Sequence, residues 1–80
     1  MSYFRDLIFQ DIINERDRQD AKWGSQRKLP MDRWNTILGE EVGEVAHAVN
    51  EGDLTNLAEE LIQVAAVAVC WLESLYDGKD

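Results

Sequence analysis

Residues 64–72, VAAVAVCWL, form the longest apolar run in this chain of 80 residues. A helix containing this run is hydrophobic on every side, so other structure has to surround it. Nine residues are about half of what a helix needs to span a bilayer. We therefore expect a buried helix and no association with a membrane.

Two more helical patterns precede this one, and no segment shows the alternation typical of strands. Residues 3–21 place apolar side chains at helical spacing, and residues 23–30 contain the only Pro and indicate a loop. The second helix is expected to begin near Pro30 or Asp32 and to end at about Glu51. The sequence predicts an all-α fold.

The third helix is expected to begin after Asp53, which is a good N-cap, and to end near Asp77. Because Gly52 and Asp53 make only a short link, helices two and three should form an antiparallel hairpin. Residues 1–80 are expected to make one domain, which on its own buries only about 60% of its unfolded surface. Two companion helices can scarcely surround the third, so we expect a four-helix-bundle-type core shared across a homodimer or homotetramer.

The charge balance restricts the possible partners. Sixteen acidic residues against eight Lys and Arg give a net charge of -8, which repels nucleic-acid backbones and anionic membranes. We expect no nucleic-acid partner. Cys70 is the only cysteine, so no disulfide can form within the chain, and a reducing, cytoplasmic location is expected.

Residues 39–45, GEEVGEV, place acids along the apolar stripe of the second helix. At about 100° per residue, Glu41 falls inside the stripe, Glu44 borders it, and Glu40 lies further out. Glu60 and then Gln63 lie on the flank of a stripe in the third helix. That stripe is expected to centre on Leu54, Leu57, Leu61, Ala68, Leu72 and Leu75. Antiparallel packing would bring Glu41 and Glu44 opposite Glu60.

Carboxylates withdrawn from water are normally paired or bound to metal. Residues 34–77 contain no Lys or Arg, so a metal is the leading explanation, and oxygen ligands favour Mg²⁺, with Mn²⁺ also possible. The alternative is a solvated acidic surface with Arg16 or Arg18 as counter-charges.

At these residues the chain resembles the MazG-like, all-α NTP pyrophosphohydrolase superfamily. The signature is Glu-Glu-x-x-Glu on one helix and Glu-x-x-Asp on the next, which match residues 40–44 and 60–63. Residues 15–24, ERDRQDAKWG, also resemble a segment of some short members. The resemblance implies Mg²⁺-dependent hydrolysis of a nucleoside triphosphate between the α- and β-phosphates, in a nucleotide-pool housecleaning role.

The resemblance also implies roles for individual residues. Glu41, Glu44 and Glu60 would be metal ligands, and Glu40 would bind another metal or orient the attacking water. Gln63 occupies the remaining ligand position, where the family has Asp. Because an amide adds no negative charge, the alternative is a catalytically weakened nucleotide-binding or metal-binding module, or a helical oligomerisation module.

Nucleotide recognition has its own candidates. Trp23 could stack on a base while Lys22 meets a phosphate, Trp34 could line the same pocket, and Gln19 could read a base edge. For each Trp the alternative is a role in the core. Longer relatives hold the phosphates with a Lys and an Asn beyond these motifs, so here that role would pass to Lys22, Arg16, Lys28 or a neighbouring subunit.

Overall fold

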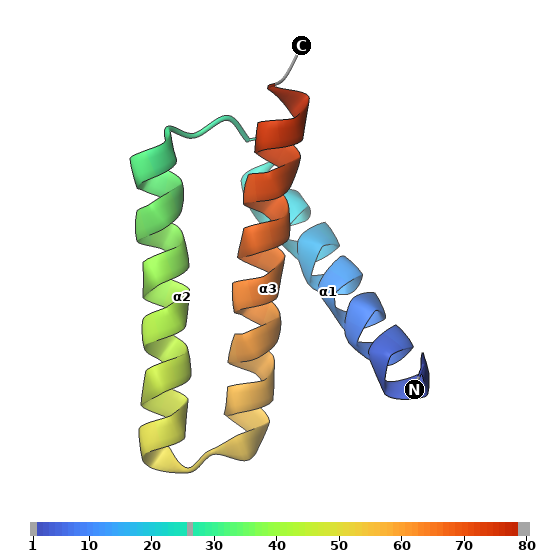
Figure 1. The fold of residues 1–80 in the computed structure, drawn as a ribbon, viewed down its shortest axis with the longest axis vertical. Helices are drawn as coiled ribbons and strands as arrows, with labels where there is room; N and C mark the ends of the chain where they lie inside the picture. Colours follow the sequence, from blue (N-terminus) through green and yellow to red (C-terminus); the bar gives the residue numbers. More distant parts are fainter. Residues whose placement is uncertain (1, 26, 79–80) are drawn as a thin grey trace.

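A computed structural model describes residues 2–25 and 27–78 of the chain. It contains three α-helices within these ranges, α1 (Ser2–Trp23), α2 (Met31–Glu51) and α3 (Leu54–Asp77), and no strand. Figure 1 shows α2 and α3 side by side as an antiparallel hairpin, with α1 against the other side of α3. The predicted all-α class and the hairpin are confirmed.

Local chemistry sets the helix ends close to the predicted positions. Gly24 takes a positive φ of 89° after α1, and its N–H donates to the Asp20 carbonyl at 2.8 Å. Gly52 ends α2 in the left-handed region at φ 67°, where a side chain would be strained. Asp53 is the N-cap of α3, since its Oδ1 accepts from the Asn56 N–H at 3.0 Å. Pro30 is the N-cap of α2 and provides no side-chain cap.

The core of the single chain is small. Its buried apolar residues are Trp34, Ala48, Ala66, Val67 and Cys70. The rings of Trp34 and Trp71 stack between α2 and α3 with centroids 6.3 Å apart. Within the described ranges α1 and α2 do not pack against each other, so α3 is the central helix that joins them.

The predicted packing stripe of α3 is wrong for the single chain. Leu54, Leu61, Leu72 and Leu75 are between 44% and 76% exposed. The buried residues Ala66, Val67 and Cys70 lie on the opposite side of the helix, given about 100° per residue. Their side chains are short and let α1 and α2 approach this side of α3 closely. The leucines, on the other side, remain uncovered.

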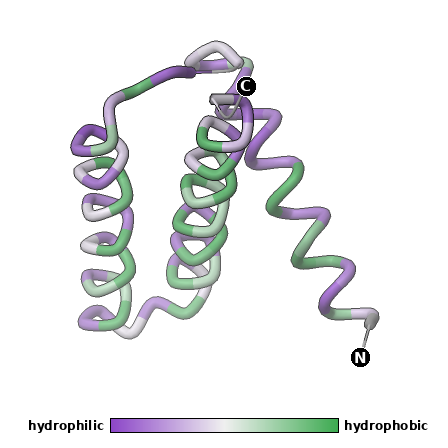
Figure 2. The backbone as a smooth tube through the Cα atoms, turned by 45° about the horizontal axis from the view of Figure 1, so that its top comes forward, coloured by the Kyte–Doolittle hydropathy of each residue, from purple (hydrophilic) through white to green (hydrophobic). Residues whose placement is uncertain are grey.

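Helix α3 is apolar along most of its length, as the green turns in Figure 2 show. By length and composition alone it could cross a membrane, and 17% of its apolar window is buried within the chain. The core helix of a soluble protein meets the same criteria, so this property does not separate a membrane helix from a covered one. The carboxylates Glu59 and Glu60 near its start would be costly in a bilayer.

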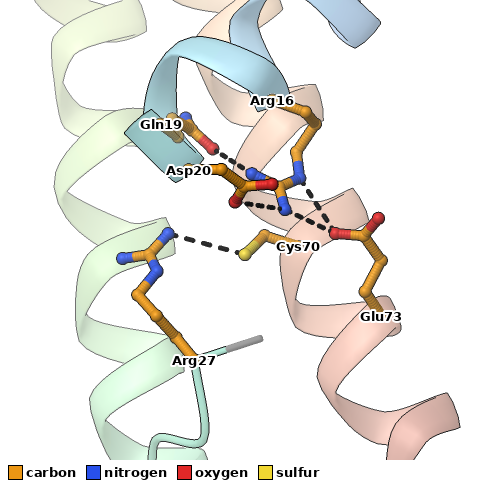
Figure 3. Close-up of polar contacts among 6 residues, drawn as sticks. All are labelled: Arg16, Gln19, Asp20, Arg27, Cys70 and Glu73. Carbon is orange, nitrogen blue, oxygen red and sulfur yellow. Dashed lines mark hydrogen bonds and ion pairs between the residues drawn. The ribbon is translucent and has the colours of Figure 1, made fainter. Parts of the chain in front are cut away.

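A polar network fastens the end of α1 to α3 (Figure 3). Arg16 is 7% exposed, and its Nη2 donates to Glu73 Oε1 at 2.6 Å and to Asp20 Oδ1 at 2.9 Å. Its Nη1 donates to Gln19 Oε1 at 3.3 Å. From the following loop, Arg27 donates to the sulfur of buried Cys70 at 3.5 Å. These contacts fix α1 and the loop against the hairpin.

Candidate active site

A groove of about 650 Å³ lies where all three helices and the α1–α2 loop contribute side chains. This volume is within the usual range for small-molecule sites. We call it the acidic groove, because five carboxylates line it: Glu15, Glu40, Glu41, Glu44 and Glu60. Gln63 lines it too. All the residues matched to the two acidic motifs therefore face one space.

The acids differ in environment as the helical geometry predicted. Glu41 is half-buried, whereas Glu40 and Glu44 are exposed. Burial raises the pKa of Glu41, and the negative charges of Glu60, Glu44, Glu15 and Glu40 raise it further. The repulsion from Glu60 acts across the interface between α3 and α2. Glu41 of α2 and Glu60 of α3 line the same groove, although the leucine stripe expected to guide this packing is exposed.

The donor set of the groove suits a hard divalent cation. Glu41, Glu44 and Glu60 offer charged oxygens, and Gln63 offers a neutral amide oxygen. Burial and the neighbouring carboxylates raise the pKa of Glu41, and a bound cation would offset both effects. Across residues 2–25 and 27–78, however, no three His, Cys, Asp or Glu side chains are close enough to hold a metal ion as they stand. Because like charges repel, a cation would have to draw these side chains together.

Four cationic side chains also line the groove: Arg18, Lys22, Arg27 and Arg33. They come from α1, the loop and the first turn of α2, outside the region that the sequence showed to be free of Lys and Arg. Arg33 precedes Glu40 by seven residues, or about 10 Å along α2. The groove therefore has an acidic and a basic part, an arrangement that can hold a metal cation together with phosphate groups.

Three of the candidate nucleotide contacts lie in the groove. Trp23 is 59% exposed, and the Nζ of Lys22 lies 4.9 Å from its ring centroid. Gln19 is 8% exposed, and its side-chain oxygen already accepts from Arg16. Trp34 is 1% exposed and is not among the lining residues, so the structure places it in the core.

Two of the proposed phosphate contacts lie elsewhere. Arg16 binds Glu73 and Asp20, and Lys28 pairs with Asp77 at 2.5 Å. Both line a separate cavity of about 340 Å³ beside Cys70. His47 is exposed on α2, and its Nε2 lies 3.2 Å from Glu51 Oε2.

Sequence reasoning missed Glu15, Arg27 and Arg33 as groove residues and named Arg18 only as a possible counter-charge to the acids. The i, i+3 spacing of Glu15 and Arg18 indicates a pair on one helix face, and the position of Arg33 two turns before Glu40 places both on one side of α2. The position of Arg27 depends on the path of the loop, and no local pattern indicates it.

An all-α hairpin that presents Glu-Glu-x-x-Glu opposite Glu-x-x-Gln defines a MazG-like pyrophosphohydrolase domain, as the motifs predicted. Residues 7–72 match the family model of phosphoribosyl-ATP pyrophosphohydrolase, and the chain belongs to this family. The family comprises pyrophosphohydrolases, which act on phosphoanhydride bonds of a nucleoside triphosphate. Membership implies dependence on a metal. Comparisons with curated proteins and with solved structures gave no significant match.

Proposed function

We propose that this protein hydrolyses a nucleoside triphosphate between its α- and β-phosphates and so removes particular nucleotides from the pool. Water adds to the α-phosphorus, the bond to the bridging oxygen breaks, and the monophosphate and pyrophosphate leave. The observation that carries the proposal is the meeting of both acidic motifs with four cationic side chains in one groove. Neither motif could form this site alone.

The chain's own residues have separable roles in this proposal. Glu41, Glu44, Glu60 and Gln63 would hold Mg²⁺ or Mn²⁺, and Glu40 would orient the attacking water or contribute to a second cation. When bound, the metal neutralises phosphate charge and lowers the pKa of a coordinated water. Lys22, Arg27 and Arg33 can meet phosphate oxygens, and the exposed ring of Trp23 can stack on a base.

The test is a panel of substrates with the purified protein and Mg²⁺, with release of pyrophosphate as the readout. The panel contains phosphoribosyl-ATP, the substrate in the family's name, along with canonical and modified NTPs and dNTPs. We expect pyrophosphate with at least one of them, and a loss of at least 100-fold in kcat/KM for Glu44→Gln. Glu59→Gln, which removes an exposed acid outside the acidic groove, is the matched control.

The second candidate is a nucleotide-binding module weakened by Gln63, whose amide cannot replace the charge of a carboxylate. Binding of a nucleotide without pyrophosphate release from any panel member would favour this function and contradict the first. Gln63→Asp separates the two further. A large gain in turnover indicates a degenerate site, and little change indicates a site adapted to Gln.

We also propose that a second copy of the chain covers the exposed leucines. A compact protein of 9.2 kDa exposes about 4,900 Å², whereas this chain exposes 5884 Å². The radius of gyration is 13.5 Å, against about 11.6 Å for a compact domain of this length. The surplus area is close to the ~800 Å² that each partner buries in a standard interface.

A homo-oligomer would complete a bundle around α3. A cytoplasmic location agrees with a nucleotide substrate and with the unpaired Cys70. The surfaces available for this interface include the apolar residues at the start of α1. Tyr3, Phe4, Leu7, Ile8 and Phe9 are all at least 45% exposed there.

A further inference from the structure

Helix α1 supplies one wall of the acidic groove although it carries neither acidic motif. Glu15 and Arg18 both line the groove and also a neighbouring cavity of about 470 Å³ between α1 and α3. With Gln63 of α3, which also lines both, they form the boundary between these two spaces. A charged pair in this position can act on whatever lies beside Glu41 and Glu60.

The pair has a fixed geometry. Arg18 Nε donates to Glu15 Oε1 at 2.9 Å, and Arg18 Nη2 donates to Glu15 Oε2 at 2.7 Å. Two parallel bonds of this kind make the pair bidentate and fix the orientation of the guanidinium plane. The Glu15 side chain is 11% exposed, whereas that of Arg18 is 63% exposed. The buried carboxylate is thus the anchor, and the exposed guanidinium is the part that it orients.

The guanidinium keeps donors for a further partner. Arg has five N–H donors, and Glu15 occupies only one on Nε and one on Nη2. Three donors remain, both on Nη1 and one on Nη2, and planar forked donors suit phosphate oxygens. The charge of Glu15 also reaches Glu41, which is where the proposed function places metal-bound phosphates.

We propose that Arg18 binds a phosphate oxygen of the substrate and that Glu15 is the positioning residue that aims it. This inference rests on the proposed function for the identity of the ligand. Arg18 would be added to Lys22 at the end of α1 and to the cations from the loop and α2, so that α1 closes the phosphate site from the side opposite α2. Arg18 would contact the phosphate directly, whereas a metal ligand acts on the phosphate through the bound cation.

The test measures binding of magnesium pyrophosphate and, separately, of Mn²⁺ alone, by titration calorimetry at one protein concentration. We expect Arg18→Gln to weaken pyrophosphate binding at least tenfold and to leave Mn²⁺ binding unchanged or tighter, because a cation near the carboxylates has been removed. Arg5→Gln is the control, since it makes the same change at an exposed site on α1. It should alter neither affinity more than twofold.

The role of Glu15 requires a double-mutant cycle. Glu15→Gln should weaken pyrophosphate binding about threefold to tenfold in the wild-type background and have no further effect in Arg18→Gln, because it acts through Arg18. Loss of Mn²⁺ binding in Glu15→Gln would instead make Glu15 a metal ligand and overturn the positioning role.

The outcomes separate this inference from the proposed function. An Arg18→Gln protein with unchanged pyrophosphate affinity, or with pyrophosphate and Mn²⁺ affinities lowered together, would contradict the inference even if the enzyme is active. A wild-type protein that binds magnesium pyrophosphate but cleaves no nucleotide would contradict the proposed function. In that case the Arg18 comparison still decides the role of Arg18.

Discussion

At the residue scale, Glu41 is the most informative position in the chain. It is half-buried among four other carboxylates, and burial followed by repulsion from Glu60 raises its pKa above the ordinary value of 4.5. A raised pKa in the folded state means that the ionised form costs stability at neutral pH. That cost persists unless a cation offsets it.

We therefore expect Glu41→Gln to stabilise the metal-free protein at pH 7. The advantage should shrink as the pH falls through the raised pKa of Glu41 and disappear below 4.5, where the native carboxyl is protonated in the folded and unfolded states alike. Urea unfolding in EDTA from pH 7 to 4, at a fixed protein concentration, measures the effect. A destabilised Glu41→Gln at pH 7 would show that the acids repel less than the geometry implies.

Metal should reverse the order of the two proteins. At Mg²⁺ equal to 100 times its Kd, a site that binds only the folded state gains about 2.7 kcal/mol. Most of that gain should be missing in Glu41→Gln. Glu51→Gln, which alters an exposed acid at the end of α2, is the control. No Mg²⁺ shift in any of the three proteins would indicate a solvated acidic face instead, and an equal shift in all three would place the cation away from Glu41.

At the scale of the elements, the sequence predicted the helices better than their packing. Gly52, Asp53 and Pro30 act locally, so the ends of α2 and α3 could be located from residue type alone. The buried face of α3 could not, because the helix is apolar all round and its leucines at 54, 61, 72 and 75 point away from α1 and α2. Choosing a face requires knowledge of where the partner helices are.

The same distinction applies to the site. The two acidic motifs share a face through helical spacing, so their meeting was predictable. The approach of α1 depends instead on tertiary contacts such as Arg16 with Glu73, which are 57 residues apart. This is why the sequence indicated Arg18 only as a possible counter-charge and gave Glu15 no place in the groove.

The docking of α1 can be tested through Arg16. Removing the guanidinium in Arg16→Ala leaves Asp20 and Glu73 without their donor and empties a mostly buried position. Because Glu73 can return to water, we expect a loss of about 2 kcal/mol rather than the larger cost of a fully buried pair. Chemical denaturation should show this loss, together with faster proteolysis within α1. Arg5→Ala serves as the control, and equal stability of the two variants would mean that the network does not hold α1.

At the scale of the whole molecule, the surplus exposed area and the uncovered leucines predict a homo-oligomer. Leu61 and Leu72 are 51% and 46% exposed on the side of α3 away from the core, where a charge can be introduced without disturbing Ala66 or Val67.

Sedimentation equilibrium of the wild type should give a dimer or tetramer. Leu61→Glu and Leu72→Glu should shift it toward the monomer and lower its thermal stability. Thr55→Glu, an equal change of charge on an exposed polar site of α3, should do neither. A wild-type monomer over the whole concentration range would contradict the shared bundle. Dissociation with retained Mn²⁺ binding would show that one chain assembles the acidic groove by itself.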